Sequence, residues 1–434
     1  MTRRRKTILC KHVTEQHPAL PDAAGESMRT HTPECSVIIP VYNKWELTRN
    51  CLASLHLHSS AHDLEVIVVD NGSSDATATD LVSYGRNLFG ERFTAIVFSE
   101  NRNFGPACNS GARAATSPVL FFLNNDTLLT PDWFPPLLKN LHALGPHGAV
   151  GPLLLYEDGL IQHMGVTFGL SGPFHLYSYF PANHPVVSRK RELQAITGAA
   201  LMIRADCFHG CGGFFEAYRN GFEDVDLCVQ IRRQGGALRC IPSSVVYHLE
   251  SQTPGRKNSE DKNGELLVRR CSMSIYPDFH LHLLRDGFEF YISDLLTICA
   301  KLTAKEDVAL RKKIQGKEAV AWFQLVKENP FWEYGREVLA HSYEKQNRYL
   351  EASVFRAELA DFSPSATRYQ DLLRLAPLVT EKPWLQTVEH HLRVITCLRN
   401  DHSYARTVVS KIRRRFRNGM DALLENALAS KLKE

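Results

Sequence analysis

Short apolar runs alternate with longer amphipathic segments in the first part of the chain. The apolar runs are rich in β-branched and aromatic residues and occupy residues 35–40, 64–69, 93–98 and 118–123. The segments between them have helical length and cover residues 44–58, 75–84 and 105–115. Strands that alternate with helices at this spacing are typical of βαβ units, so we predict a parallel sheet with helices on both faces.

The pattern then changes twice. A second ordered stretch contains an apolar run at 195–204, a short helix near 205–210, a helix in GFEDVDLCVQIRRQGG and a strand near 237–247. After about residue 260 the apolar residues follow a helical period up to the C-terminus. We therefore predict an α/β fold with a Rossmann-like, mainly parallel sheet, followed by an α-helical region.

The predicted boundaries follow from these changes of pattern. Residues 1–33 are polar, basic and aperiodic, which indicates a disordered lead-in; residues 34–258 form the α/β domain, and residues 259–434 form the helical region. Residues 331–364 match the tetratricopeptide pattern, whose repeat is about 34 residues, at Leu339, Ala340, Tyr343, Ala352 and Pro364. An ordinary helical extension explains this match about as well.

Polar loops follow three of the predicted strands at their carboxyl ends. These loops are PVYNKW after residue 39, VDNGSSDAT after residue 68 and LNNDT at residues 123–127. Open α/β sheets bind ligands at this edge, so the three loops are expected to converge on one site, with Asp126 holding a charged group. Taken alone, each loop is explained as a polar turn with a helix cap.

Two further stretches contain candidate residues. Asn103, Gly105 and Asn109 lie in NRNFGPACNSGAR, where small residues allow close backbone approach and the amides either read a nucleotide's polar edge or cap the helix. GFEDVDLC carries Glu223, Asp224 and Asp226 at a helix start, where the helix dipole alone favours acids and a general base is the functional alternative.

His248 ends the last predicted strand, SSVVYH. A single histidine at a strand end is more often structural than a ligand. It becomes a candidate for the site only if its ring reaches Asp126.

Composition and charge limit the class of protein. The chain has 434 residues, 44% of them hydrophobic, and a formal charge of +4, which does not favour a nucleic-acid binder. Its 11 cysteines are scattered singly, as in a reduced, cytoplasmic protein. No apolar stretch approaches the ~20 residues of a membrane span. SKIRRRFRNG interleaves Ile412 and Phe416 with cations, as in a helix that lies on a membrane surface or binds an acidic partner; a solvated helix face is the more common explanation.

Five motifs in order resemble the family 2 glycosyltransferases of the GT-A fold, in particular the rhamnosyltransferase-like bacterial branch. The motifs are SVIIPVYNKWELTRNCLASL, VIVVDNGSSDAT, NRNFGPACNSGARAA, VLFFLNNDT and GFEDVDLCVQIRRQG, and the resemblance covers roughly residues 35–250. It implies a metal-dependent, inverting transfer of a sugar from a nucleotide-diphospho-sugar to an acceptor hydroxyl.

The resemblance also implies roles for individual residues. LNNDT stands where the family has Asp-x-Asp, with Asn124 in the first position, so Asp126 is the metal-binding carboxylate and His248 its companion for Mg or Mn. Asp224 is the expected base, with Glu223 as the alternative. The expected nucleotide-binding set is Pro40, Tyr42, Asn43, Asp70, Asn71, Gly72, Asn103, Gly105, Asn109, Asn124 and Asn125.

The expected partners follow from the same resemblance. The donor is UDP- or dTDP-linked, and the acceptor is a glycan or lipid-linked molecule of bacterial surface glycan synthesis. The protein is expected to be cytoplasmic, with peripheral association at the inner face of the membrane, and the helical region is a candidate surface for a protein partner.

Two alternatives compete with this interpretation. Nucleotidyltransferases use similar sheets, but usually have a Gly-rich basic loop after the first strand, which PVYNKW lacks. The second alternative is a catalytically degenerate domain that serves as a scaffold through its helical region, which Asn124 and Asn125 would favour. Several intact polar residues argue against it, namely Asp70, Asp126, Glu223, Asp224 and His248.

Overall fold

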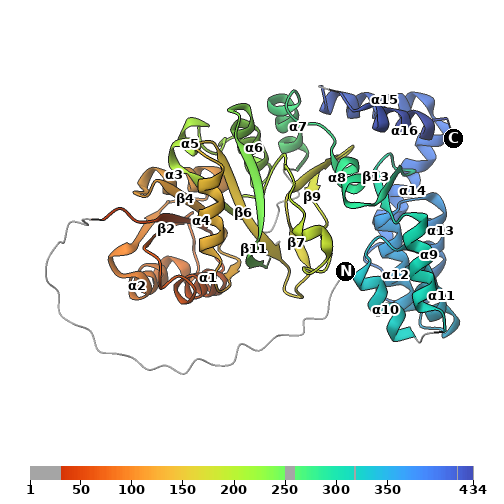
Figure 1. The fold of residues 1–434 in the computed structure, drawn as a ribbon, viewed down its shortest axis with the longest axis horizontal. Coiled ribbons are helices and arrows are strands. Elements are labelled where there is room, and N and C mark those ends of the chain that lie inside the picture. The colour runs from red at the N-terminus through yellow and green to blue at the C-terminus, as the bar shows by residue number, and fades with distance from the viewer. Residues whose placement is uncertain (1–30, 250–259, 317–318, 418, 434) are drawn as a thin grey trace.

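The computed structural model describes residues 31–249, 260–316, 319–417 and 419–433. Figure 1 shows an α/β part built around one large sheet and, beside it, a part made almost entirely of helices. The described residues therefore follow the predicted order of an α/β fold and then a helical region. Most of the predicted lead-in, residues 1–30, lies outside the described residues.

The main sheet is mixed but mostly parallel. Its strands are β1 Cys35–Val41, β2 Leu64–Asp70, β3 Phe93–Val97, β4 Val119–Leu123, β5 Thr127–Leu129, β6 Gly148–Leu155, β7 Ile161–His163, β10 Ala200–Arg204 and β11 Ala237–His248. Their order is β3-β2-β1-β4-β10-β6-β11-β5, with β7 paired to β6. The strands β1 to β4 are parallel as predicted, whereas β10 runs antiparallel between β4 and β6.

Helices cover both faces of the sheet. Helices α1 Trp45–Leu57, α2 Thr77–Phe89 and α4 Phe134–Ala143 pack on one face, and α3 Phe104–Ala114, α5 Ala205–Gly210 and α6 Glu223–Arg233 pack on the other. Side chains of β1 alternate between the two cores, with Val37 and Ile39 on one side and Ile38 on the other. Helix α3 lies so close to β1 that a Cβ at Gly111 would stand 2.5 Å from Ile38 Cγ2.

The apolar run at residues 195–204 is only partly a strand. Ala195 forms an isolated antiparallel bridge with Val166, and residues 196–199 form a loop. Side chains take two of the amide groups of this loop: Thr197 N–H donates to His163 Nε2 (3.2 Å) and Gly198 N–H to Asp224 Oδ2 (2.8 Å). A short hairpin, β8 Val166–Gly169 and β9 Gly172–His175, precedes this loop.

The second part of the chain is helical, as predicted. Its helices are α7 Glu260–Cys271, α8 Phe279–Asp286, α9 Ala304–Ile314, α10 Ala319–Glu328, α11 Glu333–Lys345, α12 Tyr349–Phe362, α13 Ala366–Leu375, α14 Leu385–Asn400, α15 His402–Arg415 and α16 Ala422–Lys431. The sequence did not predict the hairpin of β12 Glu289–Ile292 and β13 Ile298–Lys301 between α8 and α9. The tetratricopeptide-like stretch forms the pair α11 and α12, with Leu339, Ala340 and Ala352 buried.

The hydrophobic core continues across the predicted boundary at residue 258. One apolar cluster contains Leu227 of α6, Leu267 of α7, Leu283 of α8 and Phe416 after α15. The division at residue 258 stays a prediction, since the two parts share buried side chains.

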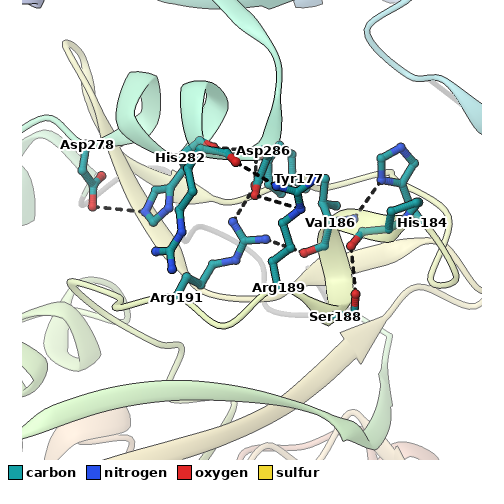
Figure 2. Close-up of polar contacts among 11 residues, drawn as sticks. Tyr177, His184, Val186, Ser188, Arg189, Arg191, Asp278, His282 and Asp286 are labelled. Carbon is teal, nitrogen blue, oxygen red and sulfur yellow. Dashed lines mark hydrogen bonds and ion pairs between the residues drawn. The ribbon is translucent and has the colours of Figure 1, made fainter.

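A buried polar cluster also joins the two parts (Figure 2). Asp286 at the end of α8 has a side chain with 0% exposure; its Oδ2 atom accepts hydrogen bonds from Arg191 Nη1 (2.6 Å) and from the Tyr177 hydroxyl (2.6 Å). Before α8, Asp278 Oδ1 accepts hydrogen bonds from Thr167 Oγ1 (2.7 Å) and Phe168 N–H (2.8 Å). The segment after β7 is therefore held by α8 and the turn before it.

The basic C-terminal helix differs from the amphipathic surface helix expected from SKIRRRFRNG. Ile412 is 5% exposed and Phe416 1%, and the Phe416 ring packs edge-on against Phe168. These apolar side chains are covered by the protein itself, so only the polar and cationic face of α15 meets solvent. Across the described ranges, no helix has both the length and the apolar character to cross a membrane.

Candidate active site

A cleft of about 200 Å³ lies at the carboxyl edge of the parallel strands. It brings together many of the predicted residues, which come from five separate segments of the chain: Pro40, Tyr42, Asn71, Asn124, Asn125, Asp126, Glu223, Asp224 and His248. The convergence predicted from the strand-end loops is therefore present in the structure.

Asp126 and His248 lie side by side in this cleft. The Asp126 Oδ1 atom is 3.1 Å from His248 Nε2, and the two side chains are 12% and 8% exposed. The pairing of β5 with β11 fixes this approach, since Thr127 is opposite His248 in the ladder and Leu249 N–H donates to the Asp126 carbonyl (2.8 Å). The condition set by the sequence for His248, contact with Asp126, is met.

This pair fits a divalent metal ion with few protein ligands. A carboxylate oxygen and an imidazole nitrogen are suitable ligands for Mn²⁺, and a carboxylate suits Mg²⁺. Among the residues that the structure describes, no cluster of three or more His, Cys, Asp and Glu side chains could hold a metal. An ion beside Asp126 and His248 would therefore take its other ligands from a bound phosphate group or from water.

The acids of GFEDVDLC separate into two groups. Asp224 lines the cleft and accepts two backbone hydrogen bonds, from Gly198 N–H at Oδ2 and from Val225 N–H at Oδ1, both of 2.8 Å. Glu223 also lines the cleft but is 3% exposed. Phe222, directly before them, has a left-handed backbone (φ 74°), which is unusual for a bulky residue and marks a locally constrained turn.

Asp226 points away from the cleft. It is 1% exposed, accepts a hydrogen bond from the Tyr218 hydroxyl (3.0 Å) and forms an ion pair with Arg270 of α7. Its place on the inner face of α6 accounts for this acid without a role in chemistry.

The loops after β1 and β2 are joined by hydrogen bonds. Asn43 N–H donates to Ser73 Oγ and Ser74 N–H to Asn43 Oδ1, both at 2.8 Å. Ser73 N–H donates to Asp70 Oδ1 (2.9 Å). These contacts fix the loops after β1 and β2 next to Pro40 and Tyr42.

Asn71 connects the loop after β2 to the loop after β3. Its amide Nδ2 donates to the Asn103 carbonyl (3.0 Å) and its Oδ1 accepts from Arg102 N–H (2.8 Å). Gly72 has φ +80°, and a Cβ there would stand 2.7 Å from the Glu100 carbonyl carbon. A larger residue is therefore excluded at position 72 by both backbone conformation and space.

Several predicted nucleotide-binding residues do not line the cleft. They are Asn43, Asp70, Gly72, Asn103, Gly105 and Asn109. The case of Asn109 is the clearest, because its side chain exchanges hydrogen bonds with the backbone of Phe214 (2.8 and 2.9 Å) and donates to Glu216 Oε1 (2.9 Å). Asn109 thus has a full structural explanation as the anchor of the loop before α6.

The structure adds cleft residues that the sequence analysis missed. They are Asn101, Phe104, His175, Thr197, Gly198, Ala199, Asn220 and Gly221. Asn220 has a recognisable signal, since it precedes the GFEDVD motif, and its Oδ1 accepts Phe104 N–H (2.9 Å). The loop at 197–199 has none, because it lies within an apolar run that reads as a strand.

Residues 36–208 match the family described as Glycosyl transferase family 2. The chain therefore carries a domain of this family, and the resemblance found in the sequence is confirmed. Together with the sheet order, this confirms the GT-A fold class followed by a helical region. The match ends before Asp224 and His248.

Two curated proteins are similar to about half of this chain. The O-antigen biosynthesis protein RfbC of Myxococcus xanthus is 29% identical over 51% of this chain and 18% of its own length. The pre-mycofactocin glycosyltransferase of Mycobacterium tuberculosis is 28% identical over 54% of this chain and 45% of its own length. The chain thus spans less than half of each of these relatives.

A similar solved structure is the mannosyltransferase PcManGT from Pyrobaculum calidifontis in complex with GDP-Man and Mn²⁺. It is 17% identical, covers 85% of this chain and 87% of its own, and has a TM-score of 0.42.

Proposed function

We propose that the protein is an inverting glycosyltransferase, which moves a sugar from a nucleotide-diphospho-sugar to an acceptor hydroxyl. The observation that carries this proposal is the single cleft shared by Asp126, His248 and Asp224 in a chain with a family 2 domain. A carboxylate–imidazole pair that can hold a cation against the diphosphate and a carboxylate for the acceptor are the two parts that such a transfer requires.

The donor lies along the carboxyl edge of β1, β2 and β4. Tyr42 has a ring that is 45% exposed and offers a stacking surface for the base, with Pro40 beside it. The resemblance places Asp70 at the edge of uracil or thymine; since Asp70 is buried and does not line the cleft, we assign it to fixing the loop beside the base through its hydrogen bond from Ser73 N–H. Asn124 and Asn125 line the diphosphate end of the cleft. Asn43 and Asn103 do not line the cleft, and they act by fixing the loops beside it.

Asp126 and His248 would hold a divalent ion, Mg or Mn, next to the diphosphate, where it would supply positive charge against the negative charge of the leaving group. The two residues contribute through their fixed spacing, since both side chains are almost fully enclosed and so keep their orientation.

Asp224 acts as the general base. Each of its oxygens accepts one backbone hydrogen bond and keeps a further lone pair for the acceptor hydroxyl. The hydroxyl gives its proton to Asp224 while its oxygen attacks the anomeric carbon from the face opposite the diphosphate. The bond from that carbon to the diphosphate oxygen breaks in the same step, so the configuration inverts. Glu223, which lines the same cleft, is the alternative base.

The acceptor is assigned to bacterial surface glycan synthesis, as a glycan or a lipid-linked molecule, with a UDP- or dTDP-linked donor. The similarity to RfbC, an O-antigen biosynthesis protein, supports this class of pathway. The site of action is the cytoplasm, at the inner face of the membrane.

Peripheral membrane contact is assigned to one face of α15. Ser403, Arg406, Thr407, Ser410, Lys411 and Arg414 line an open surface there, and all six are exposed. Helix α15 contains no acidic residue, so this face is suited to anionic lipid headgroups. Because Ile412 is buried, the contact is electrostatic and involves no insertion of apolar side chains.

A thermal-shift panel tests the proposal. The full chain is heated with UDP, dTDP, GDP and their sugar conjugates, with and without Mn²⁺, alongside the variants Asp126→Asn and Asp132→Asn. A Mn²⁺-dependent rise in Tm with one nucleotide, lost in Asp126→Asn and kept in the exposed control Asp132→Asn, is expected. No stabilisation of the wild-type chain by any nucleotide would favour the scaffold alternative.

A further inference from the structure

Gln162 on β7 is a buried polar residue that the motif analysis did not identify. Its side chain is 1% exposed, and both ends of its amide contact His248. Strand β7 lies outside the loops that carry the sequence motifs, so this contact comes from the fold alone.

The two contacts fix the orientation of the amide. Gln162 Nε2 lies 2.9 Å from the backbone carbonyl oxygen of His248, and a carbonyl oxygen only accepts, so the NH₂ group must be on this side. The atom 2.6 Å from His248 Nδ1 is therefore the amide oxygen, Oε1. Because Oε1 only accepts, His248 Nδ1 must carry a hydrogen.

The hydrogen on Nδ1 leaves Nε2 as the ring nitrogen that can act as an acceptor or a ligand. In the neutral imidazole, Nε2 then has its lone pair exposed towards Asp126 Oδ1, at 3.1 Å, and Asn124 Nδ2 lies 3.4 Å from the same nitrogen. Two acceptor atoms at this distance need either a proton between them or a cation that contacts both. Ligands bound to Mg or Mn at about 2.1 Å and at right angles are about 3 Å apart, which is the spacing found here.

We propose that Gln162 is a positioning residue that holds His248 with Nε2 directed alongside Asp126, so that the two form a ready-made pair of ligands for a divalent cation. The proposal rests on the proposed function, because it concerns the metal site of that function. Gln162 is itself held in place, since its backbone carbonyl accepts a hydrogen bond from His175 Nδ1 (3.0 Å) on β9.

The test compares two buried glutamines. Gln162→Leu removes both contacts with His248. Gln194→Leu is the matched control, because Gln194 is 2% exposed and also makes two hydrogen bonds, to the backbone of Tyr276 (2.7 and 3.1 Å), but has none with His248. A third variant, Gln162→Glu, keeps an acceptor for Nδ1–H and loses the donor to the His248 carbonyl.

The probe is Mn²⁺, with binding to the full chain followed by the electron paramagnetic resonance signal of the free ion, with and without UDP or dTDP. We expect Gln162→Leu to bind Mn²⁺ roughly 10- to 100-fold more weakly. Gln194→Leu is expected to bind like the wild type. Gln162→Glu should bind at least as tightly, since a carboxylate partner increases the basicity of a ligating imidazole.

The outcomes distinguish the positioning role of Gln162 from the presence of the metal site. Unchanged Mn²⁺ affinity in Gln162→Leu, or equal loss in Gln162→Leu and Gln194→Leu, would overturn the positioning role while leaving the metal site intact. If the wild-type chain binds no Mn²⁺ under either condition, or if Asp126→Asn binds it as tightly as the wild type, the metal site of the proposed function is wrong and the role of Gln162 is lost with it.

Discussion

The backbone N–H of Gly198 donates a 2.8 Å hydrogen bond to Asp224 Oδ2 and so joins the loop before β10 to the first turn of α6. The approach is close: a Cβ on Gly198 would stand 3.2 Å from Asp224 Cβ and 3.4 Å from the Phe104 ring. The carboxylate proposed as the base is therefore oriented by a loop that carries no motif.

Asp224 and Asp226, two residues apart on α6, should respond differently to the same change. Asp224→Asn should reduce transfer by about 10³-fold or more with little change in stability, because it removes the base and keeps the shape. Asp226→Asn should lower the free energy of unfolding by about 3 kcal/mol, because it leaves Arg270 without its buried partner. Transfer rates and urea unfolding of both variants check this. Equal activity in Asp224→Asn and the wild type would rule out Asp224 as the base.

Asn109 should matter for folding and little for nucleotide binding. Asn109→Ala removes three hydrogen bonds to Phe214 and Glu216, which should cost about 2–3 kcal/mol of stability. Under conditions where the variant remains folded, its nucleotide affinity should stay within about twofold of the wild type. A large loss of affinity, measured by calorimetry, would restore the role that the sequence assigned to it.

The Arg191–Asp286 pair should be strongly coupled. Arg191→Met leaves the Asp286 carboxylate buried beside the Tyr177 hydroxyl, which should cost about 3–5 kcal/mol. Replacing both, as Arg191→Met with Asp286→Asn, should cost less than the sum of the single changes. Denaturant unfolding of the four chains of this cycle measures the coupling, and strict additivity would show that the pair does not act as a unit.

His163 should make the protein sensitive to acid. Burial, followed by the neighbouring His175 and His248, holds the pKa of His163 well below its usual value. Below a pH of about 6.5, the unfolded chain takes up a proton on this histidine that the folded chain does not. The free energy of unfolding therefore decreases as the pH is lowered, by up to about 1.4 kcal/mol per pH unit. Above that pH the contribution is absent.

The measurement is the free energy of unfolding between about pH 5 and 8, a range that spans the usual histidine pKa. His163→Gln, which can still accept a hydrogen bond from Thr197 N–H, should have a shallower decline on the acid side. His142→Gln, at an exposed histidine of α4, should follow the wild type. Parallel curves for His163→Gln and the wild type would contradict the assignment.

The cationic face of α15 should bind anionic membranes. Changing Arg406, Lys411 and Arg414 together to glutamine should weaken co-sedimentation with phosphatidylglycerol vesicles, at about 1 kcal/mol per charge at low salt. The control makes the same change of charge on α9, at Lys305, Lys312 and Lys313, which are also exposed. Equal binding of the two triple variants would exclude α15 as the membrane face.

The sequence predicted the elements whose signal is local. The first four strands are short apolar runs, and the polar loops that follow three of them lie at one edge of the sheet, so the sheet and the place of Asp126 could be predicted together. The link from Asp126 to His248 was only a condition in the sequence, because it depends on the pairing of β5 with β11.

The rest of the site depends on contacts between distant segments. Gln162 and Gly198 have no signal of their own, since one lies in a three-residue strand and the other in an apolar run. The interpretation of Ile412 and Phe416 was wrong for a related reason. An amphipathic pattern shows that a helix has an apolar face, but it does not show whether protein or lipid covers that face.

The contacts of residues 276–286 have a consequence for how far the family 2 motifs define the cleft. Asp278 holds Phe168 in the β8–β9 hairpin, which also carries His175 of the cleft, and Asp286 holds Arg191, six residues before Thr197 of the cleft. The rim of the cleft is thus shaped by a part of the chain that lies beyond the family 2 match. Two proteins with identical motifs but unrelated C-terminal sequences would present different rims to an acceptor, so kinship in the motifs need not mean a shared substrate.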